Sequence, residues 1–228
     1  MLFDLDNTLI DRQAAFGRWA DWFAEEHQLG ASGAAWLRQA DDDGFARRDD
    51  VFDSVRARFD LRTSTEELIT TYRRTYPDFL APDGAVTAAL VALRSAGWLL
   101  GIVTNGPPTQ HTKITRAGLT ALFDGVCVSD EVGVAKPDRA IFELAARGCG
   151  ASLSGLDEGW MVGDAPVMDV GGGWGAGLKT IWMARGRAWP EADFAPDVVV
   201  DSIADAAAHL LGDASTGPEA RGATGSIT

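Results

Sequence analysis

The stretch Leu2-Phe3-Asp4-Leu5-Asp6-Asn7-Thr8-Leu9 is an apolar run that carries two aspartates and then breaks into a polar turn. Alternate residues of a β-strand share a face, so Asp4 and Asp6 are expected to point the same way at the end of a strand. Two carboxylates held that close repel each other unless a cation or a shared proton compensates them. An ordinary strand-to-turn junction with solvated aspartates is the alternative. The octet favours a catalytic site with a nucleophile, an acid/base and a metal ion.

The composition indicates a chain with a substantial buried core. Its 228 residues suffice for one large domain or for a core with a small insert, and 46% of them are hydrophobic. The 20 basic and 33 acidic side chains leave a net charge of −13, which argues against nucleic acid or an anionic membrane as a partner. No apolar run approaches the roughly 20 residues of a membrane span, and no signal peptide is expected.

The cysteines and histidines lack the spacing of a zinc site. Cys127 and Cys149 lie in apolar surroundings and are interpreted as reduced core thiols, which predicts a cytoplasmic protein. His27, His111 and His209 are scattered along the chain, which argues against their being zinc ligands.

Aromatic residues dominate the first predicted helix. They recur at helical spacing between Arg12 and Leu29, and Gly30 is expected to end that helix. We interpret them as a hydrophobic core rather than as substrate-stacking groups: Phe16, Trp19, Trp22 and Phe23.

The segment up to residue 82 is predicted to be all helical. Further helices are expected over 34–40 and 50–59, separated by a loop over 41–48. Ser64 and Glu67 have the spacing of a capping box, which predicts a helix that ends by Pro77.

From residue 83 onward, helical and apolar segments alternate. Strands are predicted at 98–103, 126–128, 160–162, 179–183 and 198–200. Helices are predicted at 83–97, about 108–117, 137–147, from just after the strand at 160–162 to about 176, and 203–211. This alternation predicts an α/β fold, a doubly wound parallel sheet. Residues 213–228 are rich in small polar residues and are predicted to be a disordered tail.

Few residues are available for the first predicted strand. Only three residues precede Asp4, whereas a central buried strand usually runs about 5 residues. Either this strand is short or the natural chain begins further upstream, and the sequence leaves both open.

Spacing locates an inserted domain. Asp4 and Thr104 are 100 residues apart, whereas a βαβ unit needs roughly 30. We therefore predict a helical cap over residues 12–82 and a core over residues 1–11 and 83–212. Thr104 and Lys136 are only 32 residues apart, so no second cap fits between them.

Polar residues suited to phosphate chemistry follow two of the predicted strands. Asp4 and Asp6 end the first strand. Thr104-Asn105-Gly106 ends the second, with a hydroxyl, an amide and a glycine that lets backbone N–H groups approach an anion. Ligands of open α/β sheets bind beyond the carboxyl ends of the strands, so these residues are expected to meet.

Two later strand ends add a cation and further carboxylates. Lys136 stands just before a helix that Pro137 opens, where its charge and the helix dipole both favour phosphate. Gly163-Asp164 is followed five residues on by Asp169, a hard-oxygen pair suited to Mg²⁺. Each feature alone also has a plain structural interpretation, as a turn, a surface lysine or a helix cap.

The order of these four strand ends resembles the four motifs of the haloacid dehalogenase (HAD) superfamily over essentially the whole core. The first motif of that family, Asp-x-Asp-x-Thr, is represented by Asp4, Asp6 and Thr8. A cap inserted directly after it is similar to the C1 arrangement of subfamily I. The resemblance implies a HAD-like α/β core with a helical C1 cap.

The same resemblance implies catalytic roles. Asp4 would be the nucleophile that forms a phosphoaspartyl intermediate. Asp6 would be the general acid/base, protonating the leaving alcohol and then activating water. Lys136 would neutralise charge on the phosphoryl group and keep Asp4 unprotonated, while Thr104 and Asn105 would hold the phosphoryl oxygens.

The resemblance also implies a Mg²⁺ site. Asp4, the backbone carbonyl of Asp6 and Asp164 would ligate the metal, and Asp169 would orient its shell directly or through water. A phosphate dianion approaching carboxylates requires compensating positive charge, which Mg²⁺ and Lys136 would supply.

Four functions are compared. A Mg²⁺-dependent phosphomonoesterase comes first. A sugar phosphomutase is the alternative, since Gly44-x-x-Arg47 resembles a mutase cap loop, although Asn7 stands where such mutases have glycine. A haloacid dehalogenase is disfavoured because dehalogenases lack the second aspartate, Asp6. A non-catalytic binding protein comes last.

The substrate is expected to be a small phosphorylated metabolite, and both a monomer and a homodimer remain open. Gln110 and Lys113 resemble a pattern of relatives that act on nucleotides or sugar phosphates. Arg47 and Arg48 lie in a predicted loop from which one of them could reach a substrate anion, but surface arginines are favoured. The acidic run 41–43 is interpreted as solvated.

Overall fold

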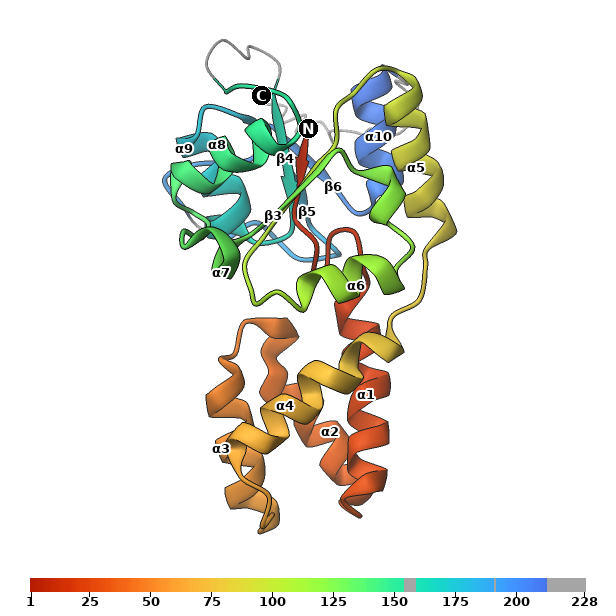
Figure 1. Cartoon of the computed structure of the whole chain (residues 1–228), viewed down its shortest axis with the longest axis vertical. Helices are drawn as coiled ribbons and strands as arrows, with labels where there is room; N and C mark the ends of the chain where they lie inside the picture. Colours follow the sequence, from red (N-terminus) through yellow and green to blue (C-terminus); the bar gives the residue numbers. More distant parts are fainter. Residues whose placement is uncertain (154–158, 191, 213–228) are drawn as a thin grey trace, which may run out of the picture.

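A computed structural model describes residues 1–153, 159–190 and 192–212 (Figure 1). The tail over residues 213–228, predicted to be disordered, lies outside the described residues. Among the described helices, none combines the length and the apolar character needed to cross a membrane.

In the described part of the chain, a six-stranded parallel sheet forms the core, with strand order β3-β2-β1-β4-β5-β6. Its strands are β1 (Leu2–Phe3), β2 (Gly101–Thr104), β3 (Gly125–Val128), β4 (Trp160–Gly163), β5 (Lys179–Met183) and β6 (Val198–Val200). Phe3 is in register with Ile102 on one side and Val162 on the other, so β1 lies at the point where the strand order reverses. The predicted fold class is confirmed, and β1 is short.

Helices cover both faces of the sheet (Figure 1). One face is covered by α5 (Gly84–Ser95) and α10 (Ile203–Leu211), with α6 (Gln110–Arg116) near the strand ends. The other face is covered by α8 (Arg139–Gly148) and α9 (Gly172–Gly175). Apolar side chains fill both interfaces, which explains why the strands read as continuous apolar runs.

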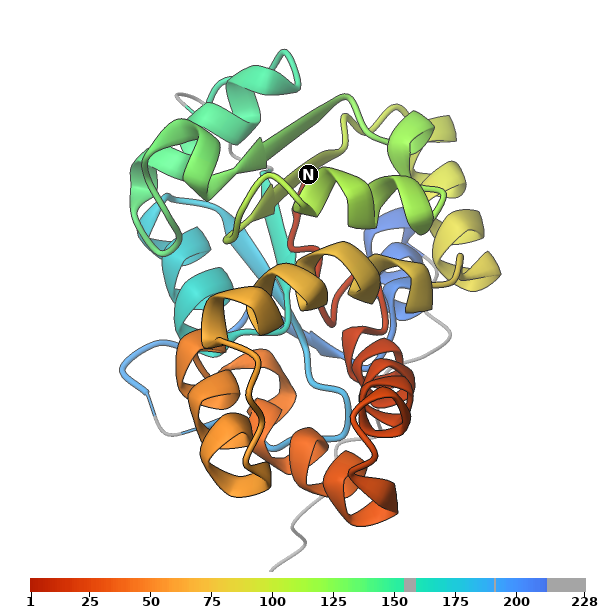
Figure 2. The same cartoon turned by 60° about the horizontal axis from the view of Figure 1, so that its bottom comes forward.

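The cap segment forms its own cluster of helices, which Figures 1 and 2 show at one end of the core. Its elements are α1 (Arg12–Glu26), α2 (Gly30–Asp41), η1 (Asp42–Gly44), α3 (Arg48–Phe59), α4 (Thr65–Thr75) and η2 (Tyr76–Phe79). Trp19 is fully buried at its centre, against Phe23 and Tyr72. The aromatic residues predicted to form a core therefore do so.

Several predicted boundaries differ from the structure. The first helix ends at Glu26 rather than Leu29, because Gln28 adopts a left-handed backbone with φ of 56°. Gly30, predicted to end the first helix, is the first residue of α2. The short helix α7 (Ser129–Val132) was not predicted.

The helix predicted to run to Ala176 is divided. A π-helical turn, η4 (Pro166–Gly171), leads into the single turn of α9. The glycines there serve packing: a Cβ on Gly172 would lie 2.8 Å from the Phe142 ring, and one on Gly173 would lie 2.8 Å from Met161. Close approach of this segment to α8 and β4 therefore overrides the low helix propensity of glycine.

Candidate active site

The carboxyl ends of β1, β2 and β4 converge at the switch point of the sheet. Asp4 follows β1 directly and its N–H donates to the carbonyl of Val162 in β4 at 2.9 Å. Thr104 ends β2 and Asp164 follows β4. These three residues line a cleft of about 350 Å³ together with Lys136.

Lys136 lines the cleft and lies between two carboxylates. Its Nζ donates to Asp4 Oδ1 at 2.6 Å and to Asp169 Oδ1 at 2.7 Å, and only 3% of its side chain is exposed. The backbone around Lys136 is held by Asn105, whose Oδ1 accepts from the Lys136 N–H at 2.8 Å. Asn105 Nδ2 also donates to the Lys136 carbonyl at 3.0 Å. The Asn105 amide therefore fixes the position of the lysine.

The Asp169 carboxylate packs directly against the backbone of Gly163 at the end of β4. A Cβ on Gly163 would overlap the Asp169 carboxylate, so only glycine fits at the end of β4. Asp169 Oδ2 accepts from the Ala165 N–H at 2.9 Å and its Oδ1 accepts from Lys136. Both oxygens of Asp169 thus have donors, and the residue is 1% exposed.

The charges in the cleft do not balance. Burial raises the pKa of Asp4 to about 8; Lys136 opposes this rise, while Asp169 and Asp164 add to it. Burial also raises the pKa of Asp164 to about 6, with the Asp169 charge adding to the rise and Arg187 opposing it. Burial lowers the pKa of Lys136, but the two carboxylates that it contacts raise it above its usual value. Three carboxylates face Lys136 and Arg187, whose Nη2 lies 3.1 Å from Asp164 Oδ2, so one negative charge remains in excess.

The residues present fit a magnesium ion. One carboxylate oxygen from each of Asp4, Asp164 and Asp169 lies within 4.8 Å of the others. Hard carboxylate oxygens are what Mg²⁺ prefers, and a divalent cation matches the excess negative charge of this cluster. The Asp6 carboxylate is not part of the cluster.

Asp6 faces a different environment from Asp4. Lys113 Nζ donates to the two Asp6 carboxylate oxygens at 2.9 and 2.7 Å, and Gln110 Nε2 donates to Asp6 Oδ2 at 3.1 Å. Burial favours the neutral acid, but Lys113 and Arg12 outweigh it and hold the pKa of Asp6 below its usual value. Gln110 also donates to the Thr104 hydroxyl at 2.6 Å, so α6 links Asp6 to the end of β2.

A second hollow, which we call the side pocket, adjoins the cleft at Asp6. Its volume is about 180 Å³, and it lies between the cap helices and α6. Its lining includes Arg48, Tyr72, Arg73 and Tyr76 from the cap and Lys113 from the core.

The acidic run in the cap loop is structural, and its interpretation as solvated was wrong for Asp41 and Asp43. Asp41 is 2% exposed and accepts from Arg12 in a bidentate pair, with both N–O distances 2.7 Å. Arg48 Nη1 lies 2.6 Å from the same carboxylate. Sequence patterns had no signal for this cluster, because its members come from three separate elements.

Asp43 connects the cap to the core. Asn7 Nδ2 donates to the Asp43 carbonyl and to its carboxylate, both at 3.1 Å. Arg185, after β5, donates to Asp43 Oδ2 at 3.1 Å. These three residues form what we call the latch.

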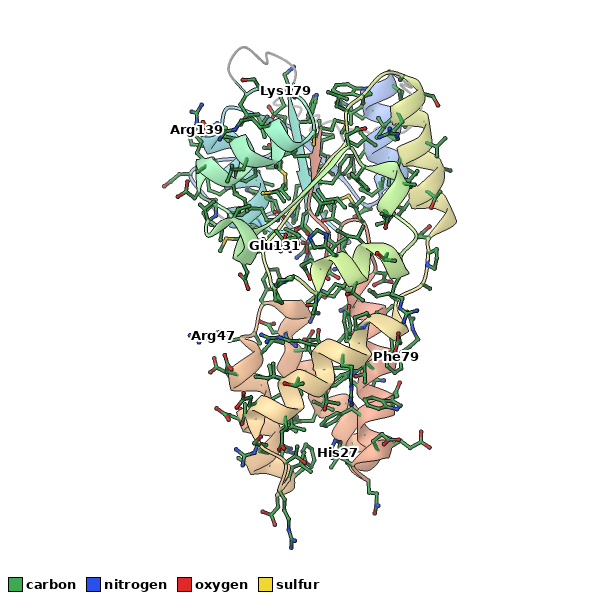
Figure 3. All side chains as sticks on the ribbon, viewed as in Figure 1. His27, Arg47, Phe79, Glu131, Arg139 and Lys179 are labelled. Carbon is green, nitrogen blue, oxygen red and sulfur yellow. The ribbon has the colours of Figure 1, made fainter. Side chains whose placement is uncertain are left out.

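Arg47 lies outside the site. Its side chain is 78% exposed, faces Asp49 and Asp50, and points away from the molecule in Figure 3. The favoured interpretation of Arg47 as a surface residue is therefore confirmed, whereas Arg48 lines the side pocket.

Comparison with known proteins identifies curated relatives. The chain is 37% identical over 132 residues to a phosphoserine phosphatase of Thermus thermophilus, covering 58% of this chain and 50% of that protein. It is 41% identical over 106 residues to the pyrimidine 5'-nucleotidase YjjG of Escherichia coli, covering 46% of each. The chain thus spans about half the length of the curated relatives that it matches.

Solved structures match over more of their length. The magnesium-bound HAD-hydrolase YfnB from Bacillus subtilis superposes with a TM-score of 0.69 at 25% identity, covering 92% of this chain and 97% of that one. A 2-haloacid dehalogenase from Pseudomonas syringae superposes with a TM-score of 0.60 at 26% identity, covering 93% and 98%. The family model of the haloacid dehalogenase-like hydrolases matches residues 1–177. Since that match includes the cap segment and the strand ends that carry Asp4, Thr104, Lys136 and Asp164, the chain belongs to this hydrolase family.

Proposed function

We propose that the protein is a Mg²⁺-dependent phosphomonoester hydrolase that acts on a small phosphorylated metabolite, a sugar phosphate or nucleotide, through a phosphoaspartyl intermediate. The observation that carries the proposal is the buried cluster of Asp4, Lys136 and Asp169 with Asp164 beside it. Relatives named as phosphatases and as a nucleotidase support the same reaction class.

The first step forms the intermediate on Asp4. A carboxylate oxygen of Asp4 attacks phosphorus, the bond to the leaving alcohol breaks, and Asp6 gives that alcohol a proton. Lys136 holds positive charge beside the reacting oxygen of Asp4. Thr104 and Asn105, both in the cleft lining, are the proposed phosphoryl contacts.

The second step releases inorganic phosphate. Asp6, now ionised, takes a proton from water as that water attacks the phosphorus of phosphorylated Asp4, and the Asp4 carboxylate is regenerated. Lys113 and Gln110 favour the ionised Asp6 that this step requires. A phosphoryl dianion bound beside Asp6 raises its pKa by like-charge repulsion, which favours the protonated form for the first step.

Asp4, Asp164 and the backbone carbonyl of Asp6 are the proposed magnesium ligands, and Asp169 orients the metal shell. The ion supplies positive charge that lets a phosphate dianion approach the carboxylates. Asp169 suits an indirect role, because Lys136 and the Ala165 N–H already occupy its oxygens.

Observations in the cap and cleft rank the alternatives. A phosphomutase rests on the likeness of Gly44-x-x-Arg47 to a mutase loop, and Arg47 faces Asp49 and Asp50 on the surface instead of the cleft. A dehalogenase has no use for a second aspartate, whereas Asp6 lies in both the cleft and the side pocket.

The cap is proposed to be a C1 cap over residues 12–82, on a core of residues 1–11 and 83–212. Its separate aromatic core supports this division. A cytoplasmic location is proposed because Cys127 and Cys149 are buried free thiols.

Metal removal tests the proposal directly. In EDTA, turnover of 4-nitrophenyl phosphate should fall to the level of the Asp4→Asn variant, and added Mg²⁺ should restore it. The Asp4→Asn exchange is nearly isosteric, so this variant should fold normally but form no phosphoenzyme detectable by intact mass. Full activity in chelator would remove the metal from the mechanism, and a phosphoenzyme in the variant would exclude Asp4 as nucleophile.

A further inference from the structure

The side pocket differs from the cleft in the sign of its charge. The described lining of the cleft has five acidic and two basic residues, whereas the described lining of the side pocket has one acidic residue, Asp6, and four basic residues. The four basic residues are Arg12, Arg48, Arg73 and Lys113. This concentration of positive charge occurs in a chain whose net charge is −13.

Pairing does not neutralise the side pocket. Lys113 and Asp6 compensate each other in one ion pair. Arg12 and Arg48 share a single partner, Asp41, so this trio keeps one excess positive charge. Arg73 forms no ion pair or hydrogen bond with any residue that the structure describes. The pocket wall therefore has about two positive charges without a counter-ion.

Arg48 is held rigidly in place. Its guanidinium lies over the rings of Phe16 and Tyr72, 5.7 and 5.5 Å from their centroids, and its Nη2 donates to the Ala46 carbonyl at 3.1 Å. A cation fixed in this way loses little side-chain entropy when it binds an anion. Arg73, one position after Tyr72 on α4, is exposed and free to turn toward a ligand.

The transferred phosphoryl group does not account for this charge. Of the residues proposed to receive it, Asp4, Thr104 and Lys136 line the cleft and not the side pocket, and only Asn105 lines both. The side pocket begins at Asp6, on the side of the leaving alcohol. Its volume of about 180 Å³ suits a compact acid group on that alcohol.

We propose that the side pocket binds an acid group on the leaving alcohol, which makes the preferred substrate a small phosphomonoester with a second anionic group, a carboxylate or another phosphate. Arg73 binds this group directly, and the fixed charge of Arg48 adds to the attraction. This inference rests on the proposed function, because its kinetic test measures the hydrolysis of phosphate esters.

Matched esters test the proposal. 3-Phosphoglycerate has a carboxylate where glycerol 3-phosphate has a hydroxymethyl group, and 1,3-propanediol bisphosphate has a second phosphate that 3-hydroxypropyl phosphate lacks. In the wild type, kcat/KM should favour an acidic member over its neutral counterpart by about 10-fold to 100-fold, as expected for a charged hydrogen bond. The pair with the larger preference identifies the acid group.

Arg73→Gln should remove most of that preference. Arg74→Gln is the matched control, because Arg74 is the next exposed arginine of α4 and does not line the pocket. The control should keep the full preference. Equal kcat/KM for both members of both pairs, or a preference that survives Arg73→Gln, would overturn the proposal.

Binding separates this proposal from the proposed function. Calorimetric titration of the Asp4→Asn variant with the same esters requires no turnover. If no ester is hydrolysed but the acidic members still bind more tightly, and Arg73→Gln in that background removes the difference, the proposed function fails and the anion subsite stands. If 4-nitrophenyl phosphate is hydrolysed but no binding preference is found, the subsite fails and the hydrolase stands.

Discussion

Asp4 and Asp6 are two positions apart, yet their surroundings favour opposite protonation states. Burial among other carboxylates raises the pKa of Asp4, whereas Lys113 and Arg12 outweigh burial and lower the pKa of Asp6. Carboxylates whose environments separate their pKa values are typical of enzymes that assign them different tasks. Asp4 reacts only when ionised, so the charges of Lys136 and a bound cation matter most to it.

Replacement of Asp6 by Asn tests its acid/base role. An alkyl alkoxide needs a proton as it leaves, and general acid catalysis typically supplies about 10²–10⁴-fold. Asp6→Asn should therefore slow phosphoenzyme formation from alkyl phosphates far more than from aryl phosphates. Loss of the base should also let phosphorylated Asp4 accumulate with an aryl substrate, visible by intact mass.

Two observations together would contradict the acid/base role of Asp6. Equal losses on both ester types, with no phosphoenzyme, would mean that Asp6 only organises the site, and the mechanism would be wrong at its central step.

Gly44 combines a backbone requirement with a packing requirement. Its φ is +95°, and a Cβ there would lie 2.7 Å from the guanidinium of Arg12. Gly97 has a similar φ of +93° with open space around it, which makes Gly97→Ala the matched control. Each alanine should cost about 1–2 kcal/mol of unfolding free energy for the left-handed backbone.

Only Gly44→Ala should also disturb the site. Displacement of Arg12 should lower kcat/KM as well as stability, while Gly97→Ala keeps wild-type kinetics. Urea unfolding and steady-state kinetics measure the two effects. Equal changes in unfolding free energy and in kcat/KM for both variants would show that the contact of residue 44 with Arg12 does not affect activity.

At the scale of secondary-structure elements, short segments hold the long-range contacts of the site. The seven-residue helix α6 brings Gln110 and Lys113 to Asp6. At the opposite ends of the strands, Asp124 accepts from the Leu100 N–H at 2.8 Å and from Arg94 at 2.9 Å. It thereby links the start of β2 to α5 and to β3.

Asp124 predicts a pH dependence of stability. Burial alone would raise its pKa, but the Leu100 N–H and Arg94 hold the pKa of Asp124 below its usual value of 3.8. A carboxyl group whose pKa is lower in the folded state stabilises the fold above its unfolded pKa and loses this contribution as pH falls through the folded value. Asp124→Asn should therefore cost about 1 kcal/mol at pH 7 and progressively less below about pH 4.

Urea unfolding at several pH values measures this difference. Glu143→Gln, which removes an exposed ion pair with Arg139, should cost less than about 1 kcal/mol at every pH. A difference for Asp124→Asn that stays constant with pH would refute the electrostatic explanation.

At the scale of the whole molecule, the cap and the core meet around the two hollows. The latch of Asn7, Asp43 and Arg185 joins them at the cleft, with Arg185 19% exposed. A separate exposed pair, Asp78 with Arg116, joins η2 to α6 at 2.7 Å. The Asp43–Arg185 pair of the latch is the more buried of the two contacts, which makes it the stronger candidate for holding the cap against the core.

A double-mutant cycle measures the latch. Asp43→Asn and Arg185→Gln should each lower kcat/KM, and their coupling should amount to about 0.5–3 kcal/mol, the range for residues in contact. The same cycle on Asp78 and Arg116 should give a smaller coupling, because both side chains are 57% exposed. Larger coupling in the exposed pair would contradict the role of the latch.

The sequence alone determined the order of elements and the candidate cleft. Apolar runs alternating with helical periodicity predict a parallel sheet, and the carboxyl ends of parallel strands share one edge. Asp4, Thr104, Lys136 and Asp164 were therefore expected to meet at that edge, and they line one cleft. This expectation needed only local patterns and the geometry common to all such sheets.

The tertiary structure decided the environment of each side chain. Arg12 and Asp41 are 29 residues apart, Lys113 and Asp6 are 107 apart, and Arg185 and Asp43 are 142 apart. The local sequence around either residue does not predict which residue it will contact, because the contact depends on how distant elements pack together in the folded chain. The opposite pKa shifts of Asp4 and Asp6 and the positive side pocket follow from that packing, since burial and neighbouring charge exist only in the folded chain.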